Sequence, residues 1–239
     1  MYLAIDTSTE NAGLALIANG RLVAEDTWRC TRNHSVELLP HVASLLSQTK
    51  VDIQDITGII AARGPGGFNG LRVGLGTAKG LAFGLNIPIV GISTLAAAAY
   101  QHVAAGLPVC AMLPAGRAEV AWAVYQKQGG EWGNILPETI SVPDEVITYV
   151  KFPTVFAGEL SEDLAQELHA RLGELAVIPS PSPISRVRAL AELGAQRLES
   201  KAGDDVATLQ PLYSRRPPIT QPKPRPPKHL NNPNQTAIQ

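Results

Sequence analysis

The stretch ARGPGGFNGLRVGLGTAKGLAFG, residues 62–84, contains eight glycines and has the spacing that bears most directly on chemistry. A glycine-rich turn at the start of a helix can hold an anion, because its backbone N–H groups point toward the ligand. The Walker A pattern is not met, since no hydroxyl residue follows Lys79, and the dinucleotide pattern GxGxxG fails after Gly66. The turn Gly64 to Gly67 is therefore a candidate anion site, and a purely structural turn is the alternative.

Asp6 is the second group that could take part in such a site. It ends an apolar run and opens the hydroxyl-rich turn DTST. A structural role for Asp6 is to hydrogen-bond this turn. The chemical alternative joins it to the glycine turn as a phosphate-binding loop, made of Asp6, Thr7, Ser8, Thr9, Gly64, Gly66 and Gly67.

The sequence does not supply the sets of residues that a metal site or another kind of catalytic site would need. His34 and His41 are seven positions apart with no acidic third ligand nearby in sequence, so interface or cap roles are expected for them instead. Cys30 and Cys110 form no CxxC pair, and the only charged groups that could activate Cys30 are two nearby arginines. We predict no catalytic residue, no nucleophile and no metal ligand.

The glycine segment also predicts a helix that makes close contact with a neighbour. Gly70 and Gly74 are four residues apart, and Gly76, Gly80 and Gly84 repeat the same spacing, which places bare backbone in two rows. Each interior glycine costs about 1 kcal/mol of helix stability relative to alanine. Close packing against another helix or strand is the usual compensation, so this helix is expected to be buried on more than one side.

The preceding segment, residues 34–48, has helical spacing and two apolar rows. A helix that packs on one sheet needs only one such row. We expect one row to face the sheet and the other a partner, with two internal rows as the alternative. The first row holds Val36, Leu39, Val42 and Leu46, and the second holds Leu38, His41 and Leu45.

The elements that position these residues follow the order βββαβαβ. Asn19-Gly20 between two apolar runs is a strong hairpin signal, so the first three strands are antiparallel. This order, with helices crossing over between parallel strands, predicts a ribonuclease-H-like α/β fold. The expected elements are strands at 2–5, 13–18, 21–28, 56–62 and 87–91, and helices at 34–48 and from about residue 70.

A looser copy of the same pattern follows a helix expected near residues 93–104, which indicates an internal duplication. We divide the chain into an N-terminal lobe, 1–104, a shortened second lobe, 105–213, and a tail, 214–239. The tail carries five lysines and arginines and no acid among many prolines, so we expect it to be extended or disordered. A solubilising role and a salt-sensitive contact with RNA both fit this composition.

The composition is that of a globular protein. The chain has 239 residues, 45% of them hydrophobic, and a net charge of −1. The N-terminus lacks the features of a signal peptide, and no apolar run is long enough to span a membrane. With two unpaired cysteines, these observations lead us to expect a cytoplasmic location.

The segments AIDTST, NHSVELLPHV and GPGGFNGLRVGLGTAKGLA together resemble the TsaB family, formerly called YeaZ. The resemblance covers roughly residues 1–100. It implies the duplicated actin and sugar-kinase-like fold and a place in the synthesis of threonylcarbamoyladenosine (t6A) in tRNA. Members are similar to the catalytic subunit TsaD but lack its metal site, and they act as its dimerisation partner.

The resemblance implies partners for this chain. TsaD would form a heterodimer with it, the ATPase TsaE would bind the joint surface, and the free chain would be a homodimer. Contact with tRNA would be indirect, and the subunit would bind no cofactor tightly, with ATP and a divalent metal on partner subunits. The family pairs through its first two helices, so the implied interface is His34, Leu38, His41, Leu45, Leu71, Arg72, Gly74, Leu75, Ala78 and Lys79.

Two departures from the family pattern weaken the case for phosphate binding and for a metal-bound nucleotide on this chain. Gly67 and Asn69 replace two hydroxyl residues of the family's glycine loop, and Arg117 alone remains of an Asp-Ala-Arg trio in the second half. Actin-like ATPases use a carboxylate from each half, which leaves Asp6 alone. A non-catalytic scaffold is therefore the leading hypothesis, and a nucleotide-dependent transferase or glycoprotease-like hydrolase is the alternative. A leucine at Gly74 is expected to prevent pairing without unfolding the subunit.

Overall fold

The computed structural model describes residues 1–31, 33–179 and 184–213, and the predicted tail at 214–239 lies outside them. Its first sheet has the order β3-β2-β1-β4-β5. β1 and β2 are antiparallel, as are β2 and β3, whereas β1, β4 and β5 run parallel. The strands are β1 (Tyr2–Asp6), β2 (Asn11–Ala18), β3 (Arg21–Arg29), β4 (Gly58–Gly64) and β5 (Ile89–Ser93). The predicted βββαβαβ order is confirmed.

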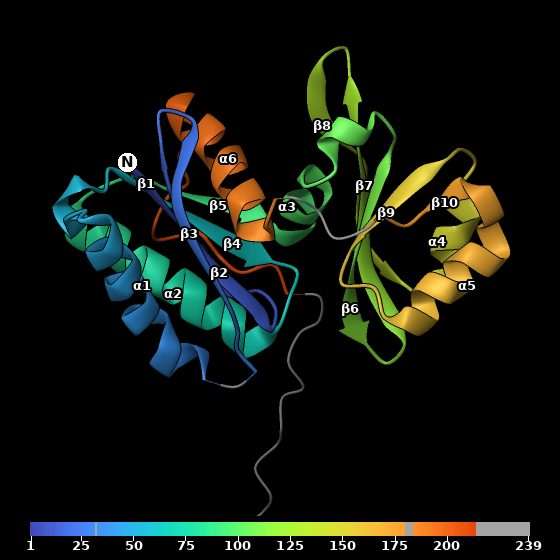
Figure 1. The fold of residues 1–239 in the computed structure, drawn as a ribbon. Coiled ribbons are helices and arrows are strands. Elements are labelled where there is room, and N and C mark those ends of the chain that lie inside the picture. The colour runs from blue at the N-terminus through green and yellow to red at the C-terminus, as the bar shows by residue number, and fades with distance from the viewer. Residues whose placement is uncertain (32, 180–183, 214–239) are drawn as a thin grey trace, which may run out of the picture.

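Helices pack on both faces of the first sheet, and alternate residues of its strands point to opposite sides. Leu3, Ile5 and Leu14 face α1 (His34–Thr49) and α2 (Phe68–Leu85). Ala4 and Ala15 face α6 (Arg186–Glu199) on the other side. Figure 1 shows α1 and α2 together on one side of the sheet and α6 on the other.

The second sheet repeats the topology of the first, with the order β8-β7-β6-β9-β10. Two antiparallel pairs are again followed by two parallel pairs. Its last strand has two residues, whereas β5, the corresponding strand of the first sheet, has five. The strands are β6 (Val109–Gly116), β7 (Glu119–Gln128), β8 (Glu131–Ser141), β9 (Thr154–Gly158) and β10 (Ala176–Val177). The predicted duplicated ribonuclease-H-like fold is confirmed.

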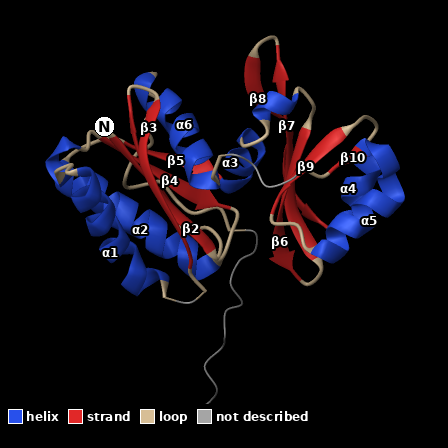
Figure 2. Ribbon diagram, viewed as in Figure 1, coloured by secondary structure: helices blue, strands red, loops and turns tan. Residues whose placement is uncertain are grey.

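Helices cover both faces of the second sheet as well (Figure 2). α4 (Pro143–Tyr149) and α5 (Glu162–Leu172) pack on the face that contains Trp122 and Phe156. α3 (Thr94–Tyr100) packs on the opposite face and also contacts α6, so these two helices lie between the lobes. Three short 3-10 turns complete the fold at Ile53–Asp55, Val103–Ala105 and Gly173–Leu175.

The chain returns to the first lobe before it ends, so the range 105–213 that we expected for the second lobe is too long. Val187, Leu190 and Leu198 of α6 lie in the core of the first lobe. The segment after α6 stays there, because Leu209 joins the core on the other face and Leu212 donates a backbone hydrogen bond to Arg63. No helix within the described residues is long and apolar enough to cross a membrane.

Candidate functional site

The turn after β1 is tied together by its own hydroxyl groups. Ser8 donates to Oδ1 of Asp6 through its backbone N–H at 3.0 Å and through its hydroxyl at 2.5 Å. Thr7 donates from its hydroxyl to the carbonyl oxygen of Gly70 at 2.8 Å. Asp6 is 1% exposed. These hydrogen bonds confirm the structural role predicted for Asp6, which is to hold the DTST turn together.

Arg186, the first residue of α6, occupies the other side of Asp6. Its Nε lies 2.6 Å from Asp6 Oδ2, and its terminal nitrogens reach Thr9 Oγ1 at 2.8 Å and Glu159 Oε1 at 3.2 Å. Burial opposes the charge of the guanidinium, but attraction from Asp6 and Glu159 outweighs it and raises the pKa of Arg186. Both oxygens of Asp6 therefore have partners, and a metal ion would have to displace this arginine to reach the carboxylate.

Sequence reasoning missed Arg186 and Glu159, although one signal pointed to the arginine. Ser185 caps α6 by accepting from the backbone of Arg188, so Arg186 lies in the first turn of the helix. A cation in this turn is disfavoured by the helix dipole. Its presence there indicates a nearby carboxylate, though not which one.

The glycine turn packs against the Asp6 turn. Gly67 donates its backbone N–H to the carbonyl oxygen of Ser8 at 2.7 Å. A Cβ on Gly66 would lie 2.2 Å from the same oxygen, and a Cβ on Gly64, where φ is +110°, would lie 2.2 Å from the backbone oxygen of Leu212. The structure thus brings the predicted phosphate-loop residues together. It uses the Gly67 amide for contact within the chain, which favours the structural reading of the turn.

A polar cleft of about 480 Å³ opens beside this network. Asn11 and Trp28 of the first lobe and Glu159 of the second contribute to its walls. Asn11 also donates to Glu159 at 3.1 Å, so the floor of the cleft is tied across the lobes. Among the residues described, no three His, Cys, Asp or Glu side chains cluster to hold a metal ion.

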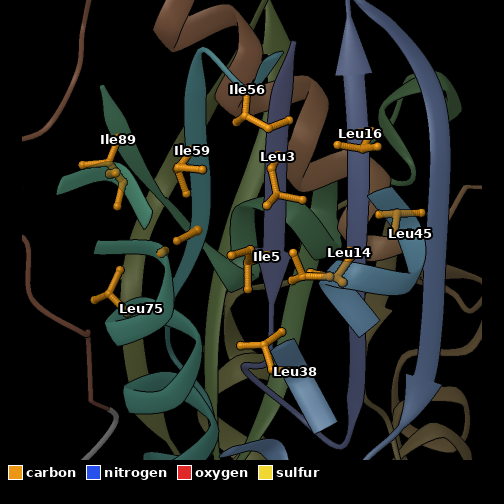
Figure 3. Packing of buried hydrophobic residues seen from close by; sticks show 14 of the residues in the cluster. Leu3, Ile5, Leu14, Leu16, Leu38, Leu45, Ile56, Ile59, Leu75 and Ile89 are labelled. Carbon is orange, nitrogen blue, oxygen red and sulfur yellow. The ribbon is translucent and has the colours of Figure 1, made fainter. Parts of the chain in front are cut away.

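The prediction of a partner interface is wrong for the apolar residues assigned to it, because these residues are buried inside the subunit. Figure 3 shows Leu38, Leu45 and Leu75 among the core residues of the first sheet. The sheet side of each helix needs its own apolar row, and these residues supply it. The members that are 3% exposed or less are Leu38, Leu45, Leu71, Leu75 and Ala78.

Gly74 faces inward as well, so the prediction that a leucine there would leave the subunit folded is wrong. A Cβ at Gly74 would lie 2.0 Å from Thr7 Oγ1, and one at Gly70 would lie 2.1 Å from the carbonyl oxygen of Thr7. The close contact predicted for this glycine row exists, but its neighbour is the turn after β1. Pairing between subunits cannot explain Gly70 and Gly74.

The polar members of the predicted interface have mixed positions. His34 is 9% exposed, and Lys79 donates to the backbone oxygens of residues 207 and 209 within its own chain. His41 lies 2.6 Å from Asp26 and stacks on Trp28 with 3.9 Å between ring centroids. Arg72 is exposed, and its guanidinium carbon lies 5.2 Å from the ring centroid of Phe68. A partner contact remains a prediction for Arg72 and for the exposed edge of His41.

The outer side of the same two helices is apolar and uncovered. Val36 is 71% exposed, Leu39 55% and Phe83 81%. Within the described chain, a Cβ added at Gly76, Gly80 or Gly84 would meet nothing within 4 Å. Because α1 and α2 pack side by side, these residues share one side of the first lobe (Figure 1). We call the set Val36, Leu39, Ala43, Gly76, Gly80, Phe83 and Gly84 the helix-pair surface.

The fold and the site define a duplicated ribonuclease-H-like protein in which the carboxylate at the end of β1 is paired with an arginine. A family model described as TsaD, tRNA N6-adenosine threonylcarbamoyltransferase, matches residues 28–207. The tRNA threonylcarbamoyladenosine biosynthesis protein TsaB of Bacillus subtilis (strain 168) is 31% identical over 219 residues, covering 89% of this chain and 93% of that protein.

Two further comparisons agree. TsaB of Escherichia coli (strain K12) is 38% identical over 148 residues, and the match covers 60% of this chain and 63% of that protein, which is less than two thirds of its length. The structure of YeaZ from Pseudomonas aeruginosa has 29% identity and a TM-score of 0.73, covering 89% of this chain and 98% of that chain. The chain belongs to the TsaB (YeaZ) family.

Proposed function

We propose that this chain takes part in the synthesis of t6A in tRNA as a non-catalytic subunit that binds TsaD through the helix-pair surface. Its relatives are named as t6A biosynthesis proteins, which supports the pathway. The observation that carries the scaffold role is the exposed apolar side of α1 and α2. Val36, Leu39 and Phe83 are each more than half exposed, and large exposed apolar patches often mark protein–protein interaction sites.

The glycines of the helix-pair surface support a helical partner. Gly76, Gly80 and Gly84 have no side chain and lie on the outer side of α2. A second helix can approach bare backbone more closely than it can approach larger side chains, and Phe83 adds a large apolar anchor beside them. This row, rather than Gly70 and Gly74, is the part of the glycine segment that fits pairing between subunits.

The contacts around Asp6 support a subunit that catalyses no reaction of its own. Arg186 neutralises Asp6, and the glycine turn binds the turn after β1. In the proposed complex, ATP and a divalent metal bind the partner subunits, TsaE joins at the combined surface, and tRNA is contacted indirectly. A homodimer of the free chain would use the same surface.

A charge on the helix-pair surface is expected to prevent pairing. Leu39→Asp should weaken binding to TsaD at least 100-fold, because the carboxylate would be desolvated in an apolar interface. The measurement is calorimetric titration of TsaD with the variant, with circular dichroism to confirm the fold. Ile135→Asp is the matched control, since Ile135 is 42% exposed on the second lobe. Equal losses in the two variants, or none in Leu39→Asp, would remove this surface from the proposal.

The alternative of an independent nucleotide-dependent enzyme has its own test. Calorimetry of the isolated chain with Mg²⁺ and ATP is expected to give no micromolar binding at the Asp6 cleft and no turnover, because Arg186 fills the position beside the carboxylate. Micromolar binding that Asp6→Asn abolishes, together with hydrolysis, would favour the enzyme over the scaffold.

A further inference from the structure

A second cleft, of about 580 Å³, lies between the lobes and has an aromatic wall. One wall comes from β5, α3 and α6, with Ile92, Ala96 and Leu193 as its apolar residues. The opposing wall is the hairpin of β7 and β8, with Tyr125 and Trp132. Its volume is within the range of small-molecule sites.

The aromatic wall has an unused hydrogen-bond donor. The rings of Trp132 and Tyr125 are nearly parallel, 11° apart, with 6.2 Å between centroids. The Nε1 atom of Trp132 is buried and has no hydrogen-bond partner among the described residues. Burial, assisted by Glu138, raises the pKa of Tyr125 to about 12, so its phenol stays protonated at neutral pH. A buried donor without an acceptor is costly, but this atom is closed to solvent, so a bound molecule would supply its acceptor only if the Trp132 ring turned toward the cleft.

The cleft also contains two arginines, of which only Arg197 forms an ion pair within the described residues. Arg197 is held by Asp204 at 3.0 Å and by the carbonyl oxygen of Gly91 at 3.0 Å. Arg63 lines the same cleft and lies close enough to Asp204 for their charges to interact, but its guanidinium donates no hydrogen bond within the part of the chain that the structure describes. A half-buried guanidinium with free donors is suited to phosphate oxygens.

We propose that this cleft binds a nucleotide unit, with the base against the Trp132 wall and the phosphate on Arg63. Aromatic side chains stack on any base, and arginine supplies the anion contact, so the two groups together select a base that carries a phosphate. The unit could come from a free mononucleotide or from single-stranded RNA, which share this chemistry. The site lies apart from the helix-pair surface and does not rest on the proposed pairing with TsaD.

The test is calorimetric titration of the isolated full chain with adenosine 5′-monophosphate, adenosine, inorganic phosphate and a five-nucleotide RNA. We expect saturable binding of the mononucleotide, the RNA or both, and at least tenfold weaker binding of adenosine and of phosphate. An RNA affinity more than tenfold above that of the mononucleotide would identify RNA as the source. Phosphate bound as tightly as the nucleotides, or no saturation by either nucleotide at millimolar concentration, would overturn the proposal.

Three variants locate the binding. Arg63→Gln and Trp132→Ala are each expected to weaken nucleotide binding about tenfold, in line with the usual strength of a charged hydrogen bond and of base stacking. Trp132→Phe keeps a ring and should lose less. Arg188→Gln is the matched control, because Arg188 pairs with Glu192 on α6 and does not line the cleft. Binding that survives both cleft substitutions in variants with native circular dichroism would contradict the assignment.

Discussion

Gly74→Leu is expected to destabilise the first lobe by about 3 kcal/mol, the upper end of the usual cost of overpacking, because the buried site can accept a side chain only if the backbone moves. The added Cβ alone would lie 2.0 Å from Thr7 Oγ1. That hydroxyl cannot rotate away freely, since it donates to the carbonyl oxygen of Gly70 and is buried. The turn after β1 would have to move, and the bonds between Ser8 and Asp6 would be lost with it. Urea unfolding followed by circular dichroism measures the effect.

Gly76→Ala is the matched control on the same helix. Gly76 is exposed, and an added Cβ meets nothing within 4 Å in the described chain. Alanine should therefore raise the stability of the free subunit by up to about 1 kcal/mol, as helix propensity predicts. A Gly74→Leu subunit with native stability would show that the row containing Gly74 lies on the outer surface, which would contradict the packing against Thr7.

The glycine helix shows what sequence could and could not predict. The spacing indicated two rows and a cost that close contact must offset. The row of Gly70 and Gly74 makes such a contact within the chain, whereas a Cβ on Gly76, Gly80 or Gly84 would meet nothing within 4 Å in the described residues. The direction of each row could not be predicted, because a glycine has no side chain whose polarity reveals whether it faces water. In the helix 34–49 the problem is different: Leu38 and Leu39 are equally apolar, so the sequence does not say which faces the sheet. The structure buries Leu38 and exposes Leu39.

The order of strands was predictable, since alternating apolar runs and the Asn19-Gly20 turn depend on local chemistry. The return of α6 to the first lobe was not. Helices α3 and α6 both have apolar faces, and hydrophobicity does not specify which sheet each covers. Shape partly determines which sheet α6 covers. A Cβ on Gly194 would lie 2.3 Å from Ile60, so α6 can pack this close to the first sheet only because residue 194 has no side chain. The ion-pair partner of Asp6 could not be predicted either. Arg186 is 180 residues away in sequence, and it reaches Asp6 only because α6 packs on the first sheet.

Arg186→Met is expected to lower the free energy of unfolding by about 3–5 kcal/mol, the usual cost of leaving a buried charge without its partner. Methionine keeps much of the apolar stem and removes the guanidinium. Asp6 would remain buried with hydrogen bonds from Ser8 alone, and the link from Thr9 to Glu159 across the lobes would be broken. Urea unfolding gives the size of the loss, and hydrogen exchange in β9 and β1 should show looser contact between the lobes.

Two further variants separate the charge pair from the helix position. Arg188 lies two residues after Arg186 on α6 and forms a more exposed ion pair with Glu192. Arg188→Met is therefore expected to lower the free energy of unfolding by less than about 1 kcal/mol. Asp6→Asn combined with Arg186→Met should recover part of the stability, because the amide that replaces the carboxylate carries no charge to bury. If Arg186→Met costs no more than Arg188→Met, the Asp6 pair does not hold the lobes together. A double variant no more stable than Arg186→Met would show that the lost stability comes from the contacts with Thr9 and Glu159 rather than from the unpaired charge of Asp6.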